Sequence, residues 1–262
     1  MSISVLYQTP TFVIVATLFV LMLVFNRIGF SIHKRQIAKN PESASDGLGP
    51  VEGSLLGLLA LLLSFTFGMS ASRYDARMQA IVQEANDIGT AVLRADLYPD
   101  SVRTILRNDF KAYVEARIAY YNAGANSRNN AVALKNSTEY SDKIWANVMQ
   151  QSQDKENTLR SQQMIPALNS MIDSVTTVEA ARNATVPDSI FWFLFLLIIT
   201  ASLIVGYSSN NKKINHVIVS GFALMTVLTV FLIMDLDRPR RGIINTNASV
   251  QNIIGLREMF KK

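Results

Sequence analysis

The chain has no cysteine and only two histidines. Without cysteine it can form neither a disulfide nor a thiolate metal site, and it has no thiol nucleophile. His33 and His216 are far apart in the sequence, which disfavours a histidine metal site or a Ser–His pair. A glycine-rich phosphate loop and a nucleophile elbow are also missing. We therefore expect a protein that is not an enzyme, with no catalytic residue, no metal site and no cofactor.

Charged side chains are scarce as well. They make up 17% of the 262 residues, whereas hydrophobic residues make up 49%, a balance typical of a membrane protein. Residues 70–188 hold 13 of the 25 basic and 14 of the 20 acidic residues. The net charge of +5 therefore arises in the short segments beside the apolar runs, where anionic lipid headgroups attract basic side chains. These charges favour a lipid bilayer, and not nucleic acid, as the partner.

Four apolar runs are long enough to cross a bilayer, and they begin near Thr11, Pro50, Ile190 and Ile214. Strand-like alternation of useful length is absent from the sequence. The pattern predicts an all-α protein of the cell membrane, with a helical, coiled-coil-like soluble domain inserted between spans two and three. The expected division is residues 1–69 (spans 1 and 2 with their connector), 70–188 (helical domain), 189–236 (spans 3 and 4) and 237–262 (C-terminal tail).

One helix is predicted to run from the second span into the helical domain, over residues 51–97. No charge occurs between Glu52 and Arg73, and residues 70–97 contain no proline. Steps of four and three residues in the outer half form the seam of a coiled coil. Its members are apolar or small: Tyr74, Met78, Ile81, Ala85, Ile88, Val92 and Ala95. A stiff helix of this kind would couple the outer half to the buried half.

Small residues recur along the second span every three or four positions, at Gly53, Gly57, Ala60, Ser64, Gly68 and Ser72. Such a stripe marks close helix–helix approach in lipid, so plain packing is one interpretation. The other is a pore shared by several subunits, with hydroxyls from Ser64 and Thr66 and an apolar constriction at Phe65 or Phe67. The candidate pore-lining or gate residues are then Gly57, Ala60, Ser64, Phe65, Phe67 and Gly68.

Charged residues follow the second and fourth spans, and two interpretations remain open for them. They either form a charged vestibule or make structural ion pairs that fix the spans together. In the second case Asp235 and Asp237 would pair with Arg238, Arg240 or Arg241, or with Arg73 and Arg77. The candidate set comprises Arg73, Asp75, Arg77, Asp235, Asp237 and Arg238.

Basic residues also predict the orientation in the membrane. No lysine or arginine precedes the first span, whereas the two short connectors hold Lys34, Arg35, Lys39, Lys212 and Lys213. The positive-inside rule therefore places both connectors in the cytoplasm and the helical domain outside it.

Four strings carry a resemblance to a known family: VEGSLLGLL at 51–59, FTF at 65–67, SRYDAR at 72–77 and DLDRPRRG at 235–242. They resemble the bacterial bestrophin-like membrane proteins, and the resemblance covers nearly the whole chain. It implies a multi-pass membrane fold, and the bestrophin label implies an oligomeric anion channel. True bestrophins are pentamers whose second span lines the pore with aromatic residues. Their calcium-clasp carboxylates are not recognisable in this sequence, so calcium activation is not expected.

Two functional hypotheses follow. The first is a homo-oligomeric ion channel or pore that conducts small ions, in which the second span lines the conduit. The alternative is a membrane-anchored sensor or scaffold that docks a partner through the coiled-coil seam. The oligomeric state distinguishes them, because a central pore requires a closed ring of copies and a scaffold does not.

Overall fold

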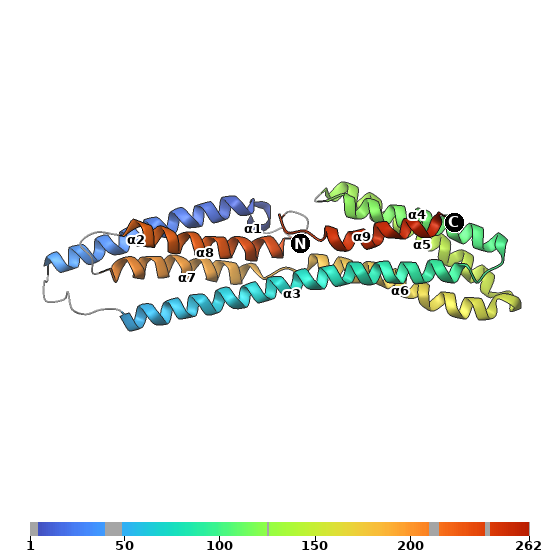
Figure 1. Ribbon diagram of the computed structural model, residues 1–262, viewed down its shortest axis with the longest axis horizontal. Coiled ribbons are helices and arrows are strands. Elements are labelled where there is room, and N and C mark those ends of the chain that lie inside the picture. Colours follow the sequence, from blue (N-terminus) through green and yellow to red (C-terminus); the bar gives the residue numbers. More distant parts are fainter. Residues whose placement is uncertain (1–4, 40–48, 125, 210–214, 239–241, 262) are drawn as a thin grey trace. The chain divides into compact units, whose positions relative to one another are not determined.

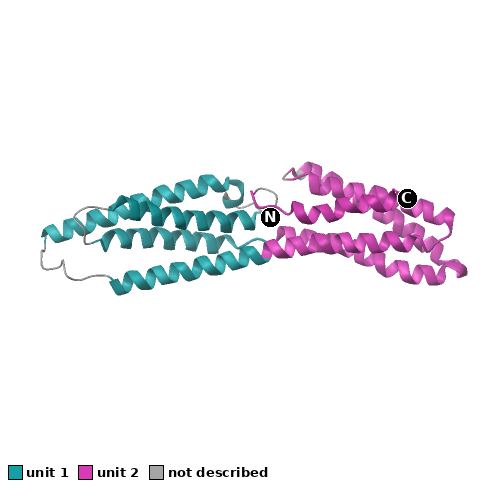
Figure 2. Cartoon of the chain, viewed as in Figure 1, with its two compact units in different colours: residues 1–72, 185–238 teal, residues 73–184, 239–262 magenta. Residues whose placement is uncertain are grey.

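The computed structural model describes residues 5–39, 49–124, 126–209, 215–238 and 242–261, and every element in these ranges is a helix. The chain divides into two compact units (Figure 2). Unit 1 comprises residues 1–72 and 185–238, and unit 2 comprises residues 73–184 and 239–262. Helix α3 (Gly49–Ala95) belongs to both units and is helical throughout, as the sequence predicts.

Unit 1 contains the apolar helices of the chain, which are labelled in Figure 1. They are α1 (Val5–Gln8), α2 (Thr11–Lys39), the first part of α3, α7 (Asp188–Tyr207) and α8 (His216–Asp237). Four helical segments are long and apolar enough to cross a membrane: α2, α3, the segment Lys155–Tyr207 that ends in α7, and α8. The prediction of an all-α protein with four candidate spans is therefore confirmed.

Helices α2 and α7 approach each other so closely that their backbones touch. A methyl group added to Gly29 would lie 2.0 Å from the carbonyl oxygen of Leu203, and one added to Gly206 would lie 2.0 Å from that of Asn26. Asn26 also donates a hydrogen bond from Nδ2 to the carbonyl oxygen of Ser202, at 3.2 Å. Only glycine permits this spacing, as is common where membrane helices cross.

Unit 2 combines the outer part of α3 with three further long helices and the C-terminal residues. Its elements are α4 (Asp100–Asn122), α5 (Ser127–Ser152), η2 (Lys155–Asn157), α6 (Thr158–Asn183), α9 (Asn247–Gly255) and η3 (Leu256–Phe260). Gly124, at φ +56°, follows the end of α4, and the Asn126 side chain caps α5 by accepting from the amide of Asn129 at 3.1 Å. Pro166 lies inside α6.

The coiled-coil seam of α3 forms part of the core of unit 2. Ile81, Ala85, Ile88, Val92 and Ala95 are all buried, at 4% exposure or less. They cluster with side chains of α4, α5, α6 and α9, including Leu106, Phe110, Ile144, Met164, Leu168 and Ile253. The seam therefore packs against the chain's own helices, and the hypothesis that it docks another protein is not supported.

Residues 239–262, most of the predicted C-terminal tail, belong to unit 2. Val250 and Ile253 of α9 are buried in its core. The hydroxyl of Tyr74 on α3 donates to the carbonyl oxygen of Asn245 at 3.1 Å. Arg257 donates to both carboxylate oxygens of Glu115 on α4, at 2.7 and 2.6 Å. These contacts hold the C-terminal residues against α3 and α4.

Candidate functional site

The membrane part of α3 has one face buried in unit 1 and one face open. Leu59, Thr66 and Ser70 are buried, at 3% exposure or less. Every candidate pore-lining residue lies on the exposed surface instead: Gly57, Ala60, Ser64, Phe65, Phe67 and Gly68. The exposed fractions of the two phenylalanines are 61% for Phe65 and 42% for Phe67. Within the described residues, the chain thus leaves this face of α3 uncovered.

The glycines in the membrane part of α3 have room around them. A methyl group added to Gly53, Gly57 or Gly68 would meet no atom within 4 Å. Among the residues that the structure describes, the stripe of small residues therefore makes no close helix crossing, in contrast to Gly29 and Gly206. Lipid, water or another chain can therefore lie against this stripe.

Helix geometry places the two phenylalanines on either side of the stripe. Each residue turns a helix by about 100°, so Phe67 lies about 60° from Ser64 and Phe65 about 100° on the other side. Thr66 lies two residues from Ser64 and faces the core of unit 1. Its hydroxyl donates to the carbonyl oxygens of Leu62 and Leu63, at 2.8 and 3.0 Å. The expectation that Thr66 offers its hydroxyl to a pore is therefore wrong, whereas Ser64 is exposed.

Asp237 and Arg238 form a structural cluster at the end of α8. The carboxylate of Asp237 accepts from the amide of Val186, at 2.9 and 3.2 Å, and from the hydroxyl of Tyr7. Arg238 donates to the carbonyl oxygens of Thr9, at 2.7 Å, and Leu6. Burial, together with the hydrogen bond to Asp237, raises the pKa of Tyr7 above its ordinary value. This cluster ties α1 and the segment just before α7 to the end of α8.

The other members of the charged set differ in exposure. Asp235 and Arg77 are buried, at 3% and 5%, Arg73 is half-buried and Asp75 is exposed. Burial of four of the six residues favours the structural role for them. Arg240 and Arg241, suggested as pairing partners, lie outside the described residues, as do Lys212 and Lys213 of the second connector.

A buried ion pair crosses the core of unit 2. Nε of Arg117 on α4 donates to Glu84 on α3, and the exposure of both side chains is 0%. The hydroxyl of Tyr121 donates to the other carboxylate oxygen of Glu84. The guanidinium carbon of Arg117 lies 4.5 Å from the centre of the Tyr120 ring, which stabilises the cation through the ring's quadrupole. Burial, reinforced by the nearby Glu84 carboxylate, raises the pKa of Tyr121.

Sequence reasoning missed this pair, although a signal exists. Glu84 lies three residues after Ile81 and four before Ile88, so it is on the side of α3 that packs into the core of unit 2. A charge at such a position requires a buried partner.

The described residues contain no group of three or more His, Asp or Glu side chains placed to hold a metal ion.

Comparison with known proteins assigns the fold and the family. A model of the Bestrophin-like domain matches residues 14–250. Two crystal structures share the fold. One is a mutant of a bacterial bestrophin homologue from Klebsiella pneumoniae, with 13% identity, a TM-score of 0.65, and coverage of 95% of this chain and 99% of that one.

The second structure is a variant of a membrane protein, with 12% identity, a TM-score of 0.64, and coverage of 93% of this chain and 99% of that one. No curated protein matches the sequence. Because the domain model spans most of the chain, this protein belongs to the bestrophin-like family.

Proposed function

We propose that this protein is the subunit of a homo-oligomeric membrane channel for small anions, with the membrane part of α3 lining the conduit. One observation carries the proposal. Gly53, Gly57 and Gly68, in the membrane part of α3, have no close neighbour among the residues that the structure describes, and they lie on the face opposite to the one that packs in unit 1. Several copies arranged around an axis would bring these faces together around a common space.

The chemistry of this face suits a narrow conduit. Gly57, Ala60 and Gly68 carry little side-chain volume, and Ser64 offers a hydroxyl to a passing ion. Phe65 and Phe67 would form apolar rings that resist wetting and so act as the constriction. Arg73 is half-buried and lies about 180° around the helix from Ser64, so it is not part of this face; its charge would raise the concentration of anions at the end of the conduit.

Two findings support an anion channel over the scaffold alternative. The family is bestrophin-like, and a solved structure with the same fold is titled a bestrophin homologue. The seam on which the scaffold hypothesis depended is already occupied by the chain's own core.

Ion flux into liposomes tests the proposal. Phe67→Ala and Phe65→Ala should each raise chloride flux, because a wider and less apolar constriction is easier to hydrate. Phe193→Ala is the matched control, since Phe193 is 52% exposed but lies on α7. Arg73→Glu should shift the reversal potential toward cations. Intact oligomers of wild type and both Phe variants that conduct no ion under any voltage or pH would refute the channel.

The orientation in the membrane is a further part of the proposal. The connectors would lie in the cytoplasm and unit 2 outside it, as the positive-inside rule predicts. The chain has no cysteine, so single Ser209→Cys and Ser170→Cys variants report on one position each. An impermeant thiol reagent added to intact cells should label position 170 and leave position 209 unlabelled. The reverse pattern would invert the topology.

A further inference from the structure

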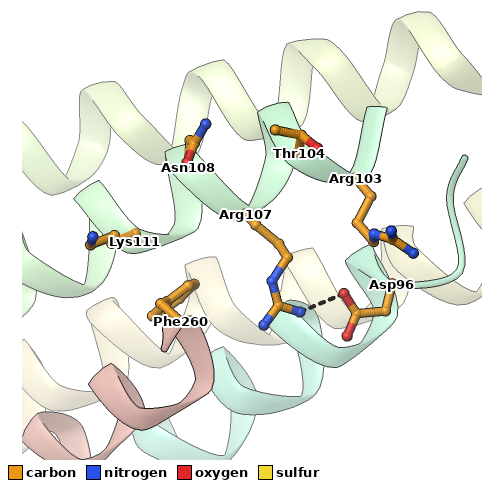
Figure 3. Close-up of a pocket in the computed structure, with 7 residues that line it drawn as sticks. All are labelled: Asp96, Arg103, Thr104, Arg107, Asn108, Lys111 and Phe260. Atoms are coloured by element: carbon orange, nitrogen blue, oxygen red, sulfur yellow. Dashed lines mark hydrogen bonds and ion pairs between the residues drawn. The ribbon is translucent and has the colours of Figure 1, made fainter. Parts of the chain in front are cut away.

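An open pocket of about 610 Å³ lies entirely within unit 2 (Figure 3). Its walls come from the first half of α4, from Asp96 just after α3, and from Phe260 in η3. The volume lies within the range of about 300–1,000 Å³ that is usual for small-molecule sites. Neither the candidate conduit nor the buried ion pair uses these residues.

One wall of the pocket is a row of cations. Arg103, Arg107 and Lys111 follow each other at intervals of four residues, so they lie on one side of α4. A rise of 1.5 Å per residue spreads the three positions over about 12 Å. Thr104 and Asn108 line the same wall. A single small anion is shorter than this row, whereas a molecule with two or more anionic groups matches it.

The acidic residues nearby neutralise only part of this charge. Asp96 accepts a hydrogen bond from Arg107, which also donates to the carbonyl oxygen of Met259. Asp100 pairs with Arg103 at 2.6 Å, but its side chain is 88% exposed, where an ion pair is weak.

Glu115, the next acidic residue along this side of α4, is bound by Arg257 through both oxygens. Lys111 is exposed and makes no hydrogen bond or ion pair within 4 Å with any residue that the structure describes. The Arg257 hydrogen bond is the main cause that lowers the pKa of Glu115, and the charge of Lys111 adds to it at longer range. The ammonium group of Lys111 is therefore available to a ligand.

We propose that this pocket binds a small organic anion that carries two or more carboxylate or phosphate groups. The ammonium group of Lys111 and the guanidinium of Arg103, whose side chain is 40% exposed, bind the anionic groups of the ligand at the two ends of the row. Arg107 adds positive potential between them while it remains bound to Asp96. The ring of Phe260, with the Arg107 guanidinium 5.9 Å from its centre, offers an apolar surface to the carbon skeleton of the ligand.

Calorimetric titration of the full-length protein in detergent tests this site, with citrate as the probe and acetate and inorganic phosphate for comparison. All titrations are made at one ionic strength, because surface charges attract any anion weakly at low salt. Citrate should bind at least tenfold more tightly than acetate or phosphate. The double variant Arg103→Ala with Lys111→Ala should weaken citrate binding at least tenfold.

The matched control is Lys135→Ala with Lys155→Ala, which removes the same charge from exposed positions of unit 2 outside the pocket. It should leave citrate binding unchanged. Lys111→Ala alone should weaken citrate binding severalfold. Because Lys111 has no hydrogen-bond partner among the described residues, this single variant should fold normally, and it therefore tests the site even if the double variant unfolds. Equal affinity of wild type and pocket variants, an equal loss in the control, or no binding at millimolar citrate would overturn the proposal. Conduction is not measured, so a negative result here leaves the channel proposal untouched.

Discussion

The two halves of α3 both repeat small or apolar residues every three or four positions, but these residues have different neighbours. In unit 2 the recurring side chains, such as Ile88 and Val92, are fully buried by the chain's own helices. In unit 1 the recurring small residues, such as Gly57 and Ser64, are exposed. A helical stripe therefore predicts that something packs along it, but not whether that neighbour is the same chain. The following substitutions test whether this difference is real, beginning with the largest expected effect.

Ile88→Asp should unfold unit 2. The truncation alone costs about 2–5 kcal/mol at a fully buried site, and a carboxylate without a partner adds a desolvation penalty. Leu93→Asp is the matched control on the same helix, because Leu93 is 61% exposed. Circular dichroism during heating should show a large loss of stability for Ile88→Asp only. Similar losses in both variants would contradict the assignment of the seam to the core.

Glu84→Gln should destabilise unit 2 by about 3–5 kcal/mol, because it leaves the Arg117 cation buried without its counter-charge. Adding Arg117→Met removes that cation, so the double variant should lose less than the sum of the two single variants. A double-mutant cycle from chemical unfolding measures the difference. Strict additivity would mean that the two side chains do not interact.

Gly206→Ala should cost about 1–3 kcal/mol, since the added methyl group meets the backbone of α2 and the helices have to shift. Gly57→Ala adds the same methyl group to the open face of α3 and should cost nothing measurable, within about 0.5 kcal/mol. Thermal unfolding of the detergent-solubilised protein compares the two. An equal loss for both would mean that the α3 stripe is packed as tightly as the α2–α7 crossing.

Local sequence patterns predicted the helices and the four candidate spans well. Apolar length identified the spans, and their predicted beginnings near Thr11, Pro50, Ile190 and Ile214 lie within two residues of the observed beginnings of α2, α3, α7 and α8. The resemblance in four short strings gave the correct family. These features depend on neighbouring residues in the sequence, which is why one sequence suffices for them.

Contacts between distant residues were not predictable in the same way. Gly29 and Gly206 fit the α2–α7 crossing as no larger residue can, yet each is an isolated glycine in an apolar run. The hydrogen bond between Tyr7 and Asp237 joins residues 230 positions apart, and no local pattern indicates it. For the same reason the seam of α3 could not be assigned to its true neighbours, which come from α4, α5, α6 and α9.

The central claim is that the open face of α3 lines a water-filled conduit, and a single cysteine at Ser64 tests it most directly. Val20→Cys is the control, because Val20 is also exposed in the isolated chain, at 57%, but lies on α2, where we expect lipid. In reconstituted oligomers a charged, water-soluble thiol reagent should modify the cysteine at position 64 and reduce chloride flux, and should leave position 20 unmodified. If position 64 reacts no faster than position 20, or reacts without any change in flux, the face does not line a conduit.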